Sequence, residues 1–252
     1  MIRRYVITAL TVGTALFASS GTAFAAPPTN AMLRLQTGTL TLGTDGTGTT
    51  PALVTWTQGK STTKGVGCCT NDISGSGAFA ETTASSWPTT MHEGDGYGYE
   101  IDSYDARGTY VGTVFTDPPT YDDGFGLNGP SGFTFTGSWT TLSQPTAWGG
   151  TVAYSTRRGA AAHYHANDRA FELVMDKGPA FGQARITVTT AGKTTSTTIN
   201  LHATTFRPRQ IVLVRNYAED PSEQESTITV TNLGTSGHSK VDVNAVGEVE
   251  ID

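Results

Sequence analysis

Two histidines, His163 and His165, are spaced so that they could bind a transition metal. They end the run Ala160 to His165, whose alternating residues predict a β-strand. Side chains two positions apart on a strand project from the same face, so both imidazole rings share one side. Such a pair holds zinc or copper when a third ligand such as His202 or Asp168 comes near. The competing interpretation is two solvated imidazoles on the polar face of an edge strand.

Oxygen ligands are the second group of residues with metal chemistry. Carboxylates at Asp242, Glu172 and Asp220 could hold a structural calcium ion between sheet edges, because hard cations take oxygen ligands. Scattered surface acids explain the same residues without a metal. Nothing else indicates a cofactor, and no Gly-x-Ser-x-Gly elbow frames a serine nucleophile. We therefore expect no catalytic activity.

The two cysteines of the chain, Cys68 and Cys69, are adjacent. Neighbouring Cα atoms are about 3.80 Å apart, which is short of the usual disulfide separation. An intrachain bridge would therefore be a strained vicinal ring. The alternatives are two free thiols or a bridge to another chain. A vicinal bridge would close almost no chain, so stability must come from sheet packing.

Aromatic side chains are the candidates for sugar contact, because the C–H face of a sugar stacks on a ring while polar groups satisfy its hydroxyls. We select Trp148, Tyr154 and Tyr164 as ligand-binding candidates. Trp148 precedes the pair Gly149-Gly150, and this turn-rich context predicts an exposed loop position. Trp139 is expected to fill the core.

Two short basic clusters, Arg157-Arg158 and Arg207-Pro208-Arg209, occur in a chain with a formal net charge of −6. They could contact an anionic glycan or a phosphate-bearing wall polymer. The alternative is a set of solvated turn residues. The acidic balance argues against a general nucleic-acid binder, which would need a basic footprint.

The composition predicts the elements that carry these residues. Charged residues are 15% of the 252 residues, against about 25% in an average soluble domain. Their place is taken by 30 Gly and 45 Thr. Threonine suits pleated, half-buried surfaces and glycine suits the turns between them, whereas long helices need Ala, Leu, Glu and Lys. The sequence therefore predicts an all-β fold.

The first 25 residues have the pattern of a secretory signal peptide, formed as a helix and cleaved after Ala25. Arg3 and Arg4 form the positive region, Val6 to Ala18 the apolar region, and Ala23-Phe24-Ala25 the cleavage site. No later stretch has the run of about 18 apolar residues that a membrane span requires. We expect a secreted, extracellular protein. The absence of an Asn-x-Ser/Thr acceptor after Ala25 favours a bacterial source.

Turn signals divide the rest of the chain into two parts. Residues 26–35 read as a flexible lead-in, 36–116 as a first β-sandwich, 117–130 as a linker and 131–252 as a second sandwich. Within the first, Tyr97 to Tyr104 alternates with period two.

The second part contains several runs typical of buried strands. In Gln210 to Tyr217, the pattern places Ile211 and Leu213 on one face and Val212 and Val214 on the other. Such a strand is buried on both sides.

The second sandwich resembles the jelly-roll, carbohydrate-binding-module-like domain appended to many exported bacterial proteins. The motifs that carry this resemblance are Thr136-Gly137-Ser138-Trp139-Thr140, Gly149-Gly150, Lys177-Gly178-Pro179 with Gly182, Gln210-Ile211-Val212-Leu213 and Val241-Asp242-Val243-Asn244-Ala245. The first sandwich resembles a fibronectin-type-III-like (immunoglobulin-like) module through Val54-Thr55-Trp56 and Tyr97 to Asp105. His163-Tyr164-His165, Met175-Asp176 and Asn244-Ala245 depart from the usual pattern of the second module.

The resemblance implies a secreted, non-catalytic protein that binds extracellular or cell-wall polysaccharide. The alternative is a structural or protein–protein interaction module of the cell surface, and a small secreted hydrolase is a weaker third. Polysaccharide binding predicts exposed aromatic residues on the second sandwich. The alternative predicts an apolar patch or an open sheet edge suited to strand addition.

Overall fold

The chain is almost entirely β-structure. The computed structural model describes residues 28–57, 64–70, 81–82, 84–94, 97–104, 107–115, 125–168, 170–217 and 224–249. Within these ranges the helical elements are two single turns, η1 (Pro130–Gly132) and η2 (Trp148–Gly150). The predicted all-β, β-sandwich fold class is confirmed. The predicted signal peptide and residues 117–124 of the predicted linker lie outside the described residues.

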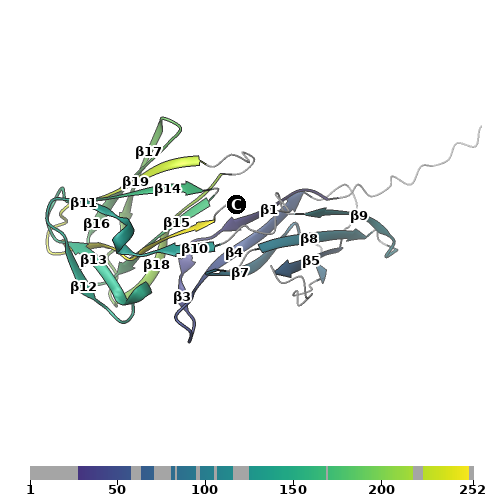
Figure 1. Ribbon diagram of the computed structural model, residues 1–252, viewed down its shortest axis with the longest axis horizontal. Coiled ribbons are helices and arrows are strands. Elements are labelled where there is room, and N and C mark those ends of the chain that lie inside the picture. The colour runs from purple at the N-terminus through teal and green to yellow at the C-terminus, as the bar shows by residue number, and fades with distance from the viewer. Residues whose placement is uncertain are drawn as a thin grey trace, which may run out of the picture.

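Two sheets are built from the first part of the chain, at the right of Figure 1. The first sheet contains β1 (Thr29–Leu35), β3 (Thr41–Leu42), β4 (Gly48–Thr57) and β7 (Ser86–His92). The second sheet contains β5 (Lys64–Thr70), β6 (Glu81–Thr82), β8 (Tyr97–Tyr104) and β9 (Tyr110–Phe115).

Three further sheets carry the second part, at the left of Figure 1. The central sheet has the order β10 (Phe125–Asn128), β21 (Ala245–Val249), β15 (Ala170–Lys177), β18 (Arg207–Asn216), β2 (Gly38–Thr39). The outer sheet has the order β11 (Thr134–Thr136), β14 (Ala161–Asp168), β19 (Gln224–Asn232), β16 (Gln183–Thr190), β17 (Lys193–Asn200). A small sheet joins β12 (Thr140–Ser143), β13 (Thr151–Ser155) and β20 (Val241–Val243).

The central sheet lies between two hydrophobic cores, which is why β15 is buried on both faces. Phe171, Leu173 and Met175 point into the core between the central and outer sheets, which we call the sandwich core. Ala170 and Val174 point the other way, into a second core. A strand buried on both faces is expected to be mostly apolar, and five of the eight residues of β15 are Ala, Phe, Leu, Val or Met.

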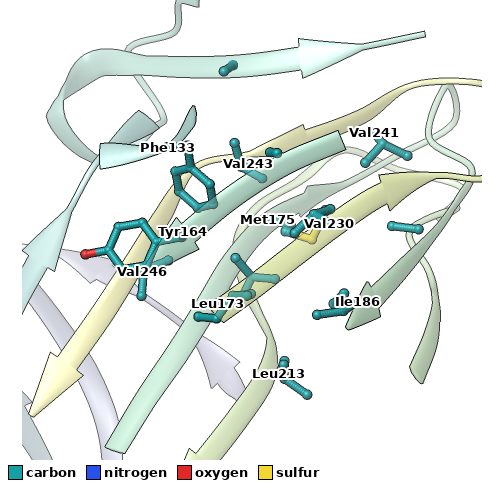
Figure 2. Close-up of a cluster of buried hydrophobic side chains, with 14 of the residues drawn as sticks. Phe133, Tyr164, Leu173, Met175, Ile186, Leu213, Val230, Val241, Val243 and Val246 are labelled. Carbon is teal, nitrogen blue, oxygen red and sulfur yellow. The ribbon is translucent and has the colours of Figure 1, made fainter. Parts of the chain in front are cut away.

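The sandwich core is filled by aliphatic and aromatic residues from both sheets. Figure 2 shows Phe133 and Tyr164 beside one another in this cluster, with Leu173, Met175, Ile186 and Val230 among the other members. The ring centroids of Phe133 and Tyr164 are 5.1 Å apart. Burial of such side chains contributes about 1.5–3 kcal/mol each to the free energy of unfolding.

The second core is shared by both parts of the chain. We call it the shared core; Leu40, Val54 and Met91 enter it from the first part, and Phe125 and Ile211 from the second. Its buried members are Ala31, Leu35, Leu40, Ala52, Val54, Trp56, Met91, Ile101, Phe125, Leu127, Ala170, Val174, Ile211, Ala245 and Val249.

Backbone pairing also joins the first and second parts of the chain. The short strand β2 pairs with β18, so the first part supplies an edge strand of the central sheet. The backbone N–H of Leu35 donates to Asn216 Oδ1 at 2.8 Å, and Asn216 Nδ2 donates to the Leu35 carbonyl at 3.1 Å. The two parts are therefore joined by hydrogen bonds as well as by apolar packing.

A β-bulge in β18 changes the faces that the sequence predicts. Leu213 pairs with Leu173 and Ile211 pairs with Val174, so one residue of β18 is inserted between the two pairs. Leu213 therefore enters the sandwich core and Ile211 the shared core. The prediction that Ile211 and Leu213 share one face is wrong, because strict alternation does not survive a bulge.

Within the described residues, no helix is long and apolar enough to cross a membrane.

Candidate functional site

The two histidines predicted to bind metal lie on the outward face of the outer sheet. His163 Nδ1 lies 3.1 Å from Thr229 Oγ1, and His165 Nδ1 lies 3.3 Å from Thr227 Oγ1. Hydroxyl groups of β19 are thus their neighbours. Within the described residues, no cluster of three or more His, Cys, Asp or Glu side chains is placed to hold a metal ion.

The other predicted metal ligands are separated from these histidines. His202 lies beside His238 at another place in the fold. The side chain of Asp168 and the whole of Asp220 lie outside the described residues, as do the side chains of Cys68 and Cys69.

The two remaining calcium candidates are buried in separate places. Glu172 points toward the first part of the chain, where Thr50 Oγ1 donates to its Oε2 at 2.6 Å. Burial raises the pKa of Glu172 to about 8. Asp242 lies beside Asp176; burial, together with repulsion from Asp176, raises the pKa of Asp242 well above its ordinary value. Both sites therefore favour a protonated carboxyl group.

Asp176, the neighbour of Asp242, is surrounded by hydrogen-bond donors. Its Oδ1 accepts hydrogen bonds from the backbone N–H of Arg209 at 2.9 Å and from Asn244 Nδ2 at 3.1 Å. Gln144 Nε2 donates to its Oδ2 at 2.6 Å. This network ties β18 and two connecting segments to the end of β15.

Two of the three predicted sugar-contacting aromatics have structural partners. Tyr164 is buried in the sandwich core and its hydroxyl donates to Glu248 Oε2 at 2.6 Å. Trp148 is on a turn, but it is half-buried rather than exposed, because its ring packs against the shared core. Its Nε1 donates to Glu93 Oε2 at 3.1 Å, which links the two parts of the chain.

The third predicted aromatic, Tyr154, lies on β13 beside a cluster of loops at one end of the sandwich. Four connecting segments meet where β13 and β15 end and where β14 and β16 begin, and we call them the loop end. They are residues 156–160, 177–182, 201–207 and 233–240. In Figure 1 they lie at the left, away from β5, β8 and β9.

Backbone hydrogen bonds hold the loop end together. The backbone N–H of Gly182 donates to the Lys240 carbonyl at 2.9 Å, and Lys240 N–H donates to the Ala180 carbonyl at 3.1 Å. Gly178 N–H donates to the Leu201 carbonyl at 3.0 Å. Gly182 has no space for a side chain, since a Cβ there would lie 1.8 Å from the carbonyl oxygen of His238. This close approach explains the glycine that follows the Lys177-Gly178-Pro179 turn.

Aromatic rings and one ammonium group lie close together at the loop end. Lys240 Nζ lies 4.9 Å from the ring centroid of Tyr154 and 4.6 Å from that of Phe181, which are cation–π distances. The ring of Phe206 lies 6.4 Å from that of Phe181 and is 46% exposed. Phe206 is therefore an exposed ring, backed by a buried one beside a fixed cation.

A pair of histidines lies in the same place. The rings of His202 and His238 are 4.2 Å apart between centroids. His238 Nδ1 donates to the Pro179 carbonyl at 2.6 Å. The loop end thus offers aromatic faces, an ammonium group and imidazole nitrogens within one set of loops.

Comparisons with known proteins give the following likenesses. Neither a protein family model nor a curated protein matches the sequence. Among solved structures, a Paenibacillus xanthan lyase matches with a TM-score of 0.41 and 11% identity, over 90% of this chain and 27% of the lyase. A family two carbohydrate esterase from Cellvibrio japonicus matches with a TM-score of 0.36 and 12% identity, over 50% of this chain and 34% of the esterase.

A carbohydrate-binding module is also among the similar structures. It is the CBM36-1 domain of a xylanase from the hindgut metagenome of Trinervitermes trinervoides, with a TM-score of 0.32 and 12% identity over 49% of this chain and 94% of the module. The chain spans about a third or less of the length of the larger proteins that it resembles. The neighbours thus include both binding modules and enzymes, and the non-catalytic role of this chain stays a prediction.

Proposed function

We propose that this protein is exported, is cleaved after Ala25 and binds extracellular or cell-wall polysaccharide without catalysis, using the loop end of its second, jelly-roll-like sandwich. The observation that carries the proposal is the exposed ring of Phe206 packed beside Phe181, with Lys240 held over Phe181 and Tyr154. A sugar ring can stack on such an aromatic face while nearby donors bind its hydroxyl groups.

The test is retention of the purified protein on insoluble polysaccharides and on cell wall, with Phe206→Ala as the binding variant. We expect binding to weaken about five- to tenfold, because one stacking contact is lost. Leu142→Ala is the matched control, since Leu142 is also 46% exposed but lies on β12. Equal retention of the two variants would place the contact elsewhere, and no retention of the wild type would refute the proposal.

A second candidate function is supported by β17. Every residue of this strand is exposed except Ile199, and among the described residues β17 pairs on one side only, with β16. An open edge of this kind can accept a strand from another protein. This is the feature expected of a structural or protein-interaction module, and retention by a protein partner instead of a polysaccharide would favour it.

A further inference from the structure

The loop end is basic, although the chain as a whole is acidic. The formal net charge of the chain is −6, with 16 Lys and Arg against 22 Asp and Glu. The four segments of the loop end contain no Asp or Glu, and they carry the histidine pair and five cationic residues: Arg157, Arg158, Lys177, Arg207 and Lys240. Positive charge is thus concentrated in one place on the molecule.

Two of these cations face one another without a counter-charge. Lys177 on β15 pairs directly with Arg207 on β18, and like charges opposite each other in a sheet are destabilising. The nearest acid in sequence, Asp176, is buried and already accepts three hydrogen bonds. A ligand that carries negative charge would relieve this repulsion.

The arginines of the neighbouring segment are also placed at the surface. Arg157 and Arg158 are exposed, and the side chain of Arg158 lies against Gly234, where a Cβ would come within 2.5 Å of it. Among the described residues, no ion pair with a carboxylate neutralises Lys177, Arg207 or this arginine pair. The four cations are therefore available to an external anion.

Lys177 and Arg207 lie next to the exposed aromatic ring of the loop end. Arg207 follows Phe206 in the chain, and Gly178, which follows Lys177, lies so close that a Cβ there would be 3.4 Å from Phe206 Cδ2. The backbone that carries the two cations therefore adjoins the residue that carries the exposed ring. Guanidinium groups bind carboxylate and phosphate oxygens through paired hydrogen bonds.

We propose that the polysaccharide bound at the loop end is anionic, with a carboxylate or phosphate group on its repeating unit that is held by Lys177 and Arg207 while the sugar ring stacks on Phe206. This inference rests on the proposed function. Acidic residues elsewhere on the chain repel a polyanion at the loop end only weakly when they lie more than a Debye length away from it. The Debye length is about 8 Å at physiological ionic strength.

The experiment compares three immobilised polymers: a polyuronate, a polyol phosphate and a neutral glucan. The variants are Lys177→Gln, Arg207→Gln and the double variant. We expect retention on a charged polymer, release by salt, and roughly tenfold weaker binding of the double variant. Neutralising the facing pair removes a repulsion, so the variants are expected to keep or raise the thermal midpoint.

The matched control is Lys193→Gln, an exposed residue at the far end of the hairpin formed by β16 and β17. Eight residues of β16 separate it from the loop end, which is roughly 25 Å. This control is expected to bind like the wild type.

Each result has a defined meaning. Preference for the polyuronate or the polyol phosphate supports the inference and identifies the anionic group. Salt-insensitive binding to the neutral glucan, unchanged in the double variant, would overturn the inference while leaving the proposed function intact. Retention on none of the polymers would overturn both. Equal retention on a DNA matrix would overturn the inference, since charge alone would then explain the binding.

Discussion

Glu172 is a carboxyl group buried between the central sheet and the first part of the chain, and Thr50 is its one hydrogen-bond donor among the described residues. Burial raises its pKa to about 8, so the folded protein holds a proton there that the unfolded chain releases at a lower pH. The raised pKa has a direct consequence for stability, because proton binding is linked to folding.

The free energy of unfolding is expected to fall as the pH rises from about 4.5 to about 8, because the unfolded chain gains stability by losing this proton and the folded protein does not. The loss is on the order of a few kcal/mol. Glu172→Gln should remove this part of the pH dependence, and urea midpoints at pH 5 and pH 8.5 measure it. The exposed Glu225→Gln serves as control. If the urea midpoint of Glu172→Gln depended on pH as that of the wild type does, the account would be contradicted.

Residue type alone does not separate the aromatic side chains that can bind a ligand from those that build the core. All three of the aromatic candidates have the residue type that can stack on a sugar, yet Tyr164 is buried against Glu248 and Trp148 bridges to Glu93. Phe206 and His238 were not selected from the sequence. Their partners, Phe181 and Pro179, are 25 and 59 residues away, and no local pattern encodes such contacts.

At the scale of elements, the local sequence predicts the positions of several strands. The run Tyr97 to Tyr104 is β8 with the same limits, and the run Gln210 to Tyr217 lies within β18 except for its last residue. Alternation and turn residues are local properties, so they can be read directly from the chain. The bulge in β18 depends on β15 beside it, and this is why the prediction that Ile211 and Leu213 share one face is wrong.

The connection between β15 and β16 is expected to control the loop end. Gly182→Ala places a Cβ against the backbone of His238, so the segment 233–240 must move and carry Lys240 with it. We expect polysaccharide retention to fall several-fold together with a stability loss of about 1–3 kcal/mol. Retention and urea unfolding measure the two effects, with the exposed Thr141→Ser on β12 as control. Wild-type retention would show that this connection does not position the site.

At the scale of the whole molecule, the shared core is the dominant feature. Side chains from β4 and β7 and from β15, β18 and β21 bury one another, and β2 belongs to a sheet of the second part. Elements that share a core lose their packing together. The two parts are therefore expected to unfold in a single cooperative transition.

Calorimetry tests this expectation with Leu40→Ala, since Leu40 is fully buried in the shared core. The substitution should cost about 2–5 kcal/mol and lower the midpoint of one transition by roughly 5–15 °C. The exposed Leu142→Ala should leave the midpoint unchanged. Two separate transitions, of which only one shifts in Leu40→Ala, would show that the parts unfold independently.

The central claim, that the loop end contacts polysaccharide, is tested most directly by backbone hydrogen exchange of the protein with and without bound polymer. The account predicts slower exchange on binding in residues 177–182, 201–207 and 233–240, with β17 unchanged. Slower exchange confined to β17 or to the outward face of β14 and β19, with the loop end unchanged, would contradict it.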